Sequence, residues 1–256
     1  MPTWWGKEST KLMSDPSTTD RITVAAIGDL HVTDSGGPRY RELFERISDE
    51  ADVLALCGDL TNFGKTHEAE LLAEDLAGCT IPAVAVLGNH DFECGQPEEV
   101  VRILGQAGVK VLDEQACMVA GVGFAGVKGF VGGFGRGELG AFGELAIKAF
   151  VDESIHEARK LENQLRTLRT DRVVAVLQYA PLAATVAGEP EVIFPFLGSS
   201  RLAEAVDRFD NVKAVVHGHA HRGTFQGRTN KGTPVYNCAQ YVVEAALGRP
   251  YALLEI

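Results

Sequence analysis

Three short apolar segments of this chain each end in a glycine that is followed by a side chain able to bind a metal ion. The segments span residues 22–27, 52–57 and 83–86, and the polar residues after them are Asp29, Asp59 and Asn89. They are evenly spaced, at roughly the 30-residue length of one strand-helix-strand unit. Because parallel strands end at the same edge of a sheet, we expect the three side chains to lie within reach of one another. The period stops after Asn89, which indicates repeated units of one sheet and not a solenoid.

The remaining pattern predicts further elements of one α/β domain. Helices are expected over residues 38–50, 66–77, 150–170 and 201–209 and from Pro97 onward, with Thr66 and either Ser199 or Ser200 as N-caps. Further strands are expected over residues 109–112, 115–127, 172–177, 212–216, 232–237 and 251–256, the second being an antiparallel pair around Gly121. We predict that residues 1–20, which include Trp4-Trp5, form a disordered tail and that residues 21–256 form a single domain.

Two segments are predicted to be loops. The segment from Gly126 to Gly143 is so rich in glycine that we expect an irregular loop beside the active site. The segment 183–199 contains an apolar stretch, Ile193 to Leu197, which we interpret as a lid or as the contact of a homo-oligomer.

Composition and charge exclude several classes of partner. The net charge is −11, and no stretch is rich in Lys or Arg, which disfavours general binding to nucleic acids or to anionic membranes. Bound metal ions could still create a local cationic site. Five scattered cysteines without a Cys-x-x-Cys spacing favour free thiols in a reducing cytoplasm. The N-terminus lacks the apolar segment of a signal peptide, and no apolar run is long enough to span a membrane.

Eight polar residues lie at the predicted strand ends: Asp29, His31, Asp59, Asn89, His90, Gln178, His219 and His221. Carboxylate oxygens and imidazole nitrogens suit Mn, Fe or Zn, and Asp59, on the middle strand, is the natural residue to bridge two ions. Two such ions about 3.5–4 Å apart can hold a hydroxide nucleophile and clamp a phosphoryl group during in-line displacement. On an extended segment, His219 and His221 would point to the same side.

Each of these residues alone is weak evidence, because a lone Asp after a strand is usually a turn former and a lone His is usually structural. His67 and His156, on predicted helix surfaces, are interpreted as structural residues. His217 is undecided and could either support the site or contact the substrate. The combination of Asp-x-His, Gly-Asp, Gly-Asn-His-Asp and Gly-His-x-His at successive strand ends favours a functional site.

These four motifs resemble those of the calcineurin-like metallophosphoesterase superfamily, over roughly residues 23–237. The resemblance implies a four-layer α/β/β/α sandwich of two mixed sheets flanked by helices. It implies one divalent metal ion on Asp29, His31, Asp59 and His221, and a second on Asp59, Asn89, Gln178 and His219. It also implies that His90 protonates the leaving group or steadies the transition state, and that Asn89 contacts the phosphate.

Gln178 departs from the family pattern, which has a histidine at that strand end, shortly before a proline that is present here as Pro181. A glutamine offers only a neutral amide oxygen, which is a weaker ligand for Mn, Fe or Zn. Three outcomes stay open: weaker binding of the second ion with turnover preserved, a site with one or a different metal ion, or loss of catalysis with retention of binding. Asn62, near which some relatives have an acidic residue, is given no role.

We therefore expect a metal-dependent phosphohydrolase that acts on a small phosphorylated substrate. A phosphodiesterase is favoured over a protein phosphatase, because almost no chain is left for a large docking surface. A small phosphodiester, a nucleotide or a phosphomonoester could each be the substrate. The alternative is a binding protein with a degenerate site, which only Gln178 favours.

Overall fold

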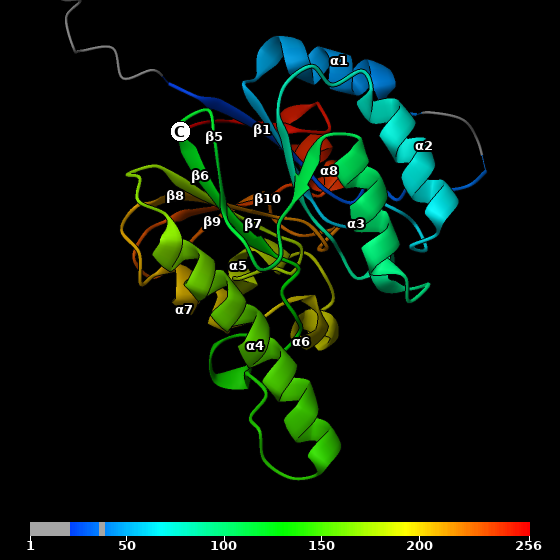
Figure 1. Cartoon of the computed structure of the whole chain (residues 1–256). Helices are drawn as coiled ribbons and strands as arrows, with labels where there is room; N and C mark the ends of the chain where they lie inside the picture. The colour runs from blue at the N-terminus through cyan, green and yellow to red at the C-terminus, as the bar shows by residue number, and fades with distance from the viewer. Residues whose placement is uncertain (1–20, 36–38) are drawn as a thin grey trace, which may run out of the picture.

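The computed structural model describes residues 21–35 and 39–256 and consists of two β-sheets packed face to face, with helices on both outer faces (Figure 1). The predicted four-layer α/β/β/α sandwich is therefore confirmed. The predicted tail over residues 1–20, with Trp4-Trp5, lies outside the described residues. No helix in the described part of the chain is long and apolar enough to cross a membrane.

The first sheet contains the three evenly spaced strands. Its order is β11-β1-β2-β3-β4, with bounds Ala252–Glu255, Thr23–Ile27, Val53–Cys57, Ala83–Val86 and Val109–Val111. The four strands β1 to β4 are parallel, and β11 pairs antiparallel with β1. All residues of β2 and β3 are buried, as expected for strands covered on both faces. The carboxyl ends of β1, β2 and β3 meet at one edge, as predicted.

The second sheet has the order β5-β6-β7-β8-β10-β9, with bounds Cys117–Val119, Val122–Val127, Val173–Leu177, Val212–His217, Pro234–Asn237 and Gln226–Arg228. Its four inner strands are parallel and its two edge strands are antiparallel to their neighbours. The strands β5 and β6 form the predicted antiparallel pair around Gly121. The edge strand β9 was not predicted, because its exposed residues carry no apolar alternation.

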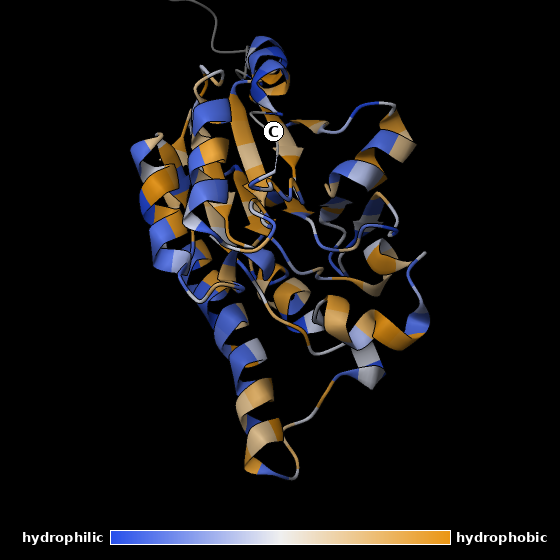
Figure 2. Cartoon of the chain, turned by 90° about the vertical axis from the view of Figure 1, so that its right-hand side faces the viewer, coloured by the Kyte–Doolittle hydropathy of each residue, from blue (hydrophilic) through white to orange (hydrophobic). Residues whose placement is uncertain are grey.

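Three apolar layers hold the sandwich together. Helices α1 (Arg41–Glu50), α2 (Thr66–Leu76) and α3 (Pro97–Gln106) cover the outer face of the first sheet. Helices α4 (Leu145–Thr167) and α7 (Ser200–Val206) cover the outer face of the second sheet, and a third layer lies between the sheets. In Figure 2 the helices alternate between hydrophilic and hydrophobic residues, as expected of helices with one buried face.

The helix boundaries differ from several predictions: α1 begins at Arg41, later than predicted, and α7 ends at Val206, before the predicted residue 209. Helix α4 begins at Leu145 and ends at Thr167, which is earlier at both ends than predicted. Helix α2 begins at Thr66, so Lys65 and not Thr66 is its N-cap. The reason is Glu68, whose carboxylate accepts the backbone N–H groups of Phe63 and Lys65. Ser199 caps α7 as predicted, since its hydroxyl accepts the N–H of Arg201.

Both predicted loops contain regular structure. Segment 183–199 forms the short helices α5 (Ala183–Val186), η3 (Glu191–Ile193) and α6 (Phe194–Leu197), packed on a small apolar cluster. The glycine-rich segment starts inside β6, where a Cβ at Gly126 would come 2.8 Å from the carbonyl oxygen of Val176, and it later forms η2 (Gly135–Gly137). An unpredicted helix, α8 (Gln240–Leu247), follows β10. All five cysteines are free thiols.

Candidate metal centre

The predicted site residues lie together where strands of both sheets end. Backbone hydrogen bonds join the turns after β1 and β2, since the N–H of Asp29 donates to Gly58 and that of His31 donates to Asp59, each over 3.0 Å. The second sheet adds Gln178 after β7 and the Gly-His-x-His segment after β8, whose His219 N–H donates to the Asp29 carboxylate over 3.0 Å. The tertiary fold thus gathers residues from five separate parts of the chain.

Two overlapping groups of side chains could each hold a metal ion. Asp29, His31 and His221 form one group, and His31, Asp59 and His90 form the other, with the ligand atoms of each group within 4.8 Å of one another. Within the first group, the Nε2 atom of His221 lies 3.1 Å from Oδ1 of Asp29 and 3.4 Å from Nε2 of His31. The first group matches three of the four ligands expected for the first ion. The second group contains His90, which was expected to be catalytic and not a ligand.

Unusual backbone geometry marks these positions. Asp29, His31, Asp59 and His219 have φ values of 60°, 45°, 47° and 72°, a region that side-chain-bearing residues rarely adopt. Ala120 is the single other non-glycine residue with positive φ in residues 21–35 and 39–256. Such conformations persist where surrounding contacts impose them, and they cluster at functional sites. The expectation that His219 and His221 share an extended segment is wrong, because the backbone of His219 has a left-handed conformation.

The glycines before the polar residues are required by close packing. A Cβ atom at Gly58 would overlap Gln178, and one at Gly88 would overlap the Asp59 carboxylate. At Gly218 an added Cβ would lie 2.5 Å from Oδ2 of Asp29. Glycine therefore precedes each polar residue because a side chain from a neighbouring strand end packs directly against the backbone at that position.

Backbone carbonyl groups orient two of the histidines. The His90 Nδ1–H donates to the carbonyl oxygen of Asn62 over 2.7 Å, which leaves Nε2 for the site. The His219 Nε2–H donates to the carbonyl oxygen of Phe196 in α6 over 3.2 Å, which leaves Nδ1. Histidine ligands are usually fixed in this way by the other ring nitrogen. Asn62, to which the sequence assigned no role, thus contributes through its main chain.

Three of the expected ligands have a buried polar atom without a hydrogen-bond partner. These atoms are Nδ1 of His31, Oδ1 of Asn89, which lies beside His90 at the start of η1 (His90–Phe92), and Oε1 of Gln178. Unpartnered buried polar atoms are rare and point to an ion or water at the site. Oxygen and nitrogen donors of this kind suit Mn, Fe or Zn, so the donor set fits a divalent cation.

The charges at the site are poorly balanced without a cation. Burial raises the pKa of Asp59 well above its usual range, and the nearby carboxylates Asp29 and Asp91 raise it further. Burial also opposes the charge of Asp29, but the hydrogen bond and charge of His221, together with the charges of His219 and His31, outweigh it, and the pKa of Asp29 is lowered. Burial, partly offset by Asp29, lowers the pKa of His31 to about 4. A divalent cation would stabilise both carboxylates in their charged form.

Gln178 lies against both carboxylates. Its Nε2 atom donates to Oδ1 of Asp29 over 3.4 Å, and a hydrogen bond from this side chain also lowers the pKa of Asp59. In this arrangement the amide is a hydrogen-bond donor. To bind a cation, Gln178 would have to use the other end of its amide group, because only the oxygen Oε1 can be a metal ligand.

Sequence reasoning missed one supporting residue, Asp91, and left a second, His217, undecided. The buried carboxylate of Asp91 accepts the backbone N–H groups of Leu60, Thr61 and Gly88, and it thereby joins the turns after β2 and β3. Its place directly after His90 in a tight turn was the available signal. His217, left undecided, has both ring nitrogens bonded, to the carbonyl of Gly218 and the hydroxyl of Thr185, and therefore supports the segment that carries His219.

A family model of calcineurin-like phosphoesterases matches residues 22–223. The chain belongs to the calcineurin-like phosphoesterase family. Members of this family are metal-dependent phosphoesterases, and the possible metal-binding groups of this calcineurin-like phosphoesterase agree with that general activity. A comparison with curated proteins gave no significant match.

Solved structures share the fold of this calcineurin-like phosphoesterase. The phosphopantetheinyl hydrolase PptH of Mycobacterium tuberculosis is 16% identical, with a TM-score of 0.64, and the match covers 92% of this chain and 96% of that one. The protein TT1561 of Thermus thermophilus is 17% identical, with a TM-score of 0.57, and the match covers 92% of this chain and 99% of that one. At such low identity, these likenesses establish the fold alone.

Proposed function

We propose that this calcineurin-like phosphoesterase is a phosphodiesterase for a small phosphodiester or nucleotide and that it uses two divalent metal ions. The observation that carries the proposal is the convergence of Asp29, His31, Asp59, His90 and His221 into two overlapping groups with ligand atoms within 4.8 Å. His31 belongs to both groups, and buried atoms of Asn89 and Gln178 lack hydrogen-bond partners. No comparable reason favours a macromolecular substrate.

The proposed ligands are Asp29, His31, Asp59 and His221 for one ion and Asp59, Asn89, Gln178 and His219 for the other. Bound there, the ions would supply positive charge for the phosphate oxygens and activate water at neutral pH. His90 is the proposed proton donor to the leaving oxygen, since the Asn62 carbonyl fixes its Nδ1–H and directs Nε2 toward the site. The partially buried Asn89 would contact the phosphate.

The direct test combines metal analysis with an assay. We expect about two metal ions per chain by mass spectrometry after incubation with manganese, and hydrolysis of bis-p-nitrophenyl phosphate that depends on added manganese. A protein that binds at most one ion per chain and turns over neither this diester nor the monoester p-nitrophenyl phosphate in excess manganese would contradict the proposal. Hydrolysis of the monoester alone would replace the diesterase assignment with a phosphomonoesterase.

One observation favours a second function, a metallophosphoesterase fold that binds ligands without catalysis. The Gln178 amide donates a hydrogen bond to Asp29, in a place where the family motif has a histidine ligand. A donor in this place stabilises the charged carboxylates, and so it provides part of the stabilisation that a cation would otherwise provide. The two functions differ in what a histidine at this position would do.

We expect Gln178→His to reach half-maximal turnover at a manganese concentration roughly tenfold lower than the wild type, the scale on which changes around a metal site alter its affinity. The reason is that an imidazole nitrogen binds Mn, Fe or Zn more strongly than a neutral amide oxygen. Turnover of bis-p-nitrophenyl phosphate during a manganese titration measures the effect.

Gln178→Leu, which can neither ligate nor donate, is the matched control and should need more manganese than the wild type. Equal manganese dependence of all three proteins would contradict a ligand role of position 178. An inactive wild type together with an active Gln178→His variant would identify the natural protein as a binding protein with a degenerate site.

A further inference from the structure

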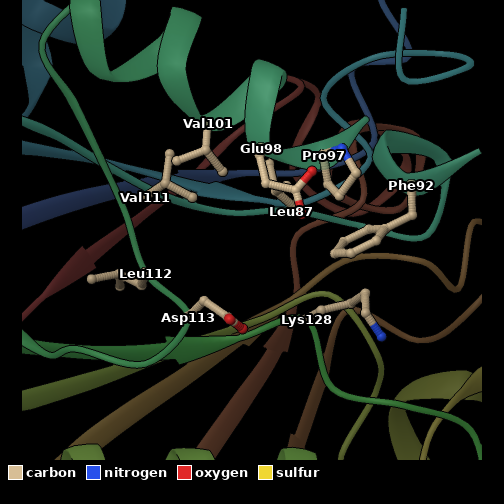
Figure 3. Close-up of a pocket in the computed structure, with 9 residues that line it drawn as sticks. All are labelled: Leu87, Phe92, Pro97, Glu98, Val101, Val111, Leu112, Asp113 and Lys128. Atoms are coloured by element: carbon tan, nitrogen blue, oxygen red, sulfur yellow. The ribbon is translucent and has the colours of Figure 1, made fainter. Parts of the chain in front are cut away.

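A cavity of about 180 Å³ lies beside the turn that carries His90 (Figure 3). It lies between η1, α3, the end of β4 and the residue after β6 and is partly open to solvent. Six apolar side chains form most of its wall: Leu87, Phe92, Pro97, Val101, Val111 and Leu112. None of the proposed metal ligands lines it, so the proposed chemistry leaves the cavity without a role.

In Figure 3, Phe92 and Lys128 lie at one end of the cavity, and Val101 and Val111 lie at the other. Phe92 belongs to the same 3₁₀ helix as His90, and its N–H donates to the carbonyl oxygen of Asn89 over 3.2 Å. One residue of the cavity wall and the proposed proton donor His90 therefore share one short helix.

Lys128 provides a second connection. Its Nζ atom lies 5.5 Å from the centre of the Phe92 ring and 5.6 Å from that of Tyr179. The Tyr179 ring in turn lies 4.5 Å from the ring of His219. Within the described residues, Lys128 forms no salt bridge, and its Nζ donates to the carbonyl oxygen of Gly129. Lys128 therefore contacts one ring of the cavity wall and a second ring that adjoins His219.

The lining limits what can bind. A cavity of about 150 Å³ with apolar walls is large enough for benzene, so this one has room for one aromatic ring. In Figure 3, Glu98 and Asp113 lie on opposite sides of the middle of the cavity, where they disfavour an anionic group, and Asp113 is paired with Lys160. The occupant that fits the walls is therefore an uncharged ring, while an attached phosphate would lie on the side of Lys128.

The surface around the metal centre has the same character. Exposed aromatic side chains adjoin residues that hold the site: Phe63 follows Asn62, Phe196 supplies the carbonyl for His219, and the Tyr241 ring lies 5.6 Å from His221. Exposed apolar groups gathered in one place commonly mark a binding site. Phe142, which is 93% exposed, lies in the segment before α4 and contributes to neither the cavity nor the metal ligands.

We infer that the cavity binds the alcohol portion of the phosphate ester and that this portion carries an uncharged, single aromatic ring. The inference rests on the proposed function, because it requires the phosphate to be held at the metal centre. Phe92, which shares η1 with His90, forms one end of the cavity, and Val101 lies at the other end.

Benzylphosphonate and methylphosphonate test this inference, because they share one charged head group and neither is hydrolysed as an ester. Calorimetry with the manganese-loaded protein should give a Kd for benzylphosphonate that is about tenfold to a hundredfold lower than the Kd for methylphosphonate. This difference is expected for burial of one apolar group of this size. Val101→Trp, which fills the far end, should bring the two Kd values close together and leave that of methylphosphonate unchanged. Phe92→Ala should also reduce the ratio.

Phe142→Ala is the matched control and should keep the wild-type ratio, since it removes an exposed ring elsewhere. Equal Kd values in the wild type, or a ratio that neither Val101→Trp nor Phe92→Ala reduces, would overturn the role of the cavity and leave the proposed function intact. If neither phosphonate binds the manganese-loaded protein, the proposed function fails first, and the inference built on it fails too.

Discussion

Asp59→Asn should lower kcat/KM for bis-p-nitrophenyl phosphate by roughly a thousandfold, because the bridging charge contributes several kcal/mol to transition-state stabilisation through the metal ions. The substitution keeps the shape of the side chain and an oxygen that accepts the N–H of His90, a bond of 2.9 Å in the wild type. We expect the metal content, measured by mass spectrometry, to fall from about two ions per chain to one or fewer.

The free energy of unfolding of Asp59→Asn shows whether the substitution leaves the fold intact. Burial and the neighbouring Asp29 and Asp91 disfavour the charge of Asp59, so its loss should not decrease the free energy of unfolding of the metal-free protein. Asp75→Asn is the matched control, since Asp75 is a buried carboxylate in α2 that accepts the N–H groups of Arg39 and Tyr40. Full metal content and turnover in Asp59→Asn would contradict the bridging role.

His90→Gln should lower kcat by about a hundredfold to ten-thousandfold, the range typical for loss of a general acid or base. The metal content should stay at the wild-type value, because His90 is proposed to donate a proton and not to bind a metal ion. The loss should be greater for a diester with an unactivated phenol than for bis-p-nitrophenyl phosphate, since a good leaving group needs less protonation. Steady-state kinetics with both diesters measure the difference.

His67→Gln is the control for this change, because His67 is an exposed residue of α2 that pairs with Glu70. It should leave both rates unchanged. A loss of one metal ion in His90→Gln would instead identify His90 as a ligand, as its grouping with His31 and Asp59 allows. An equal loss for both diesters would contradict the role of proton donor.

Regular patterns carried most of the fold prediction. The even spacing of Asp29, Asp59 and Asn89 indicated parallel strands, and the apolar segments before them became the largely buried centre of the first sheet. Elements without such a pattern were missed, including β9 and α8, because an exposed edge strand and a short helix carry little periodic signal. The segment 183–199 was predicted to be a loop, and its short helices form only through packing on the apolar cluster of Ala180, Val186, Leu197 and Ala220.

The sequence by itself determined which side chains come to the strand ends, because the alternation of apolar segments, glycines and polar residues is local. The tertiary structure alone decided how these side chains face one another. Gln178 donates to Asp29 across 149 residues, and His221 reaches the same carboxylate across 192. The carbonyls that orient His90 and His219, the left-handed backbone at the proposed ligands and the cavity beside Phe92 likewise depend on contacts between distant segments, which no local pattern encodes.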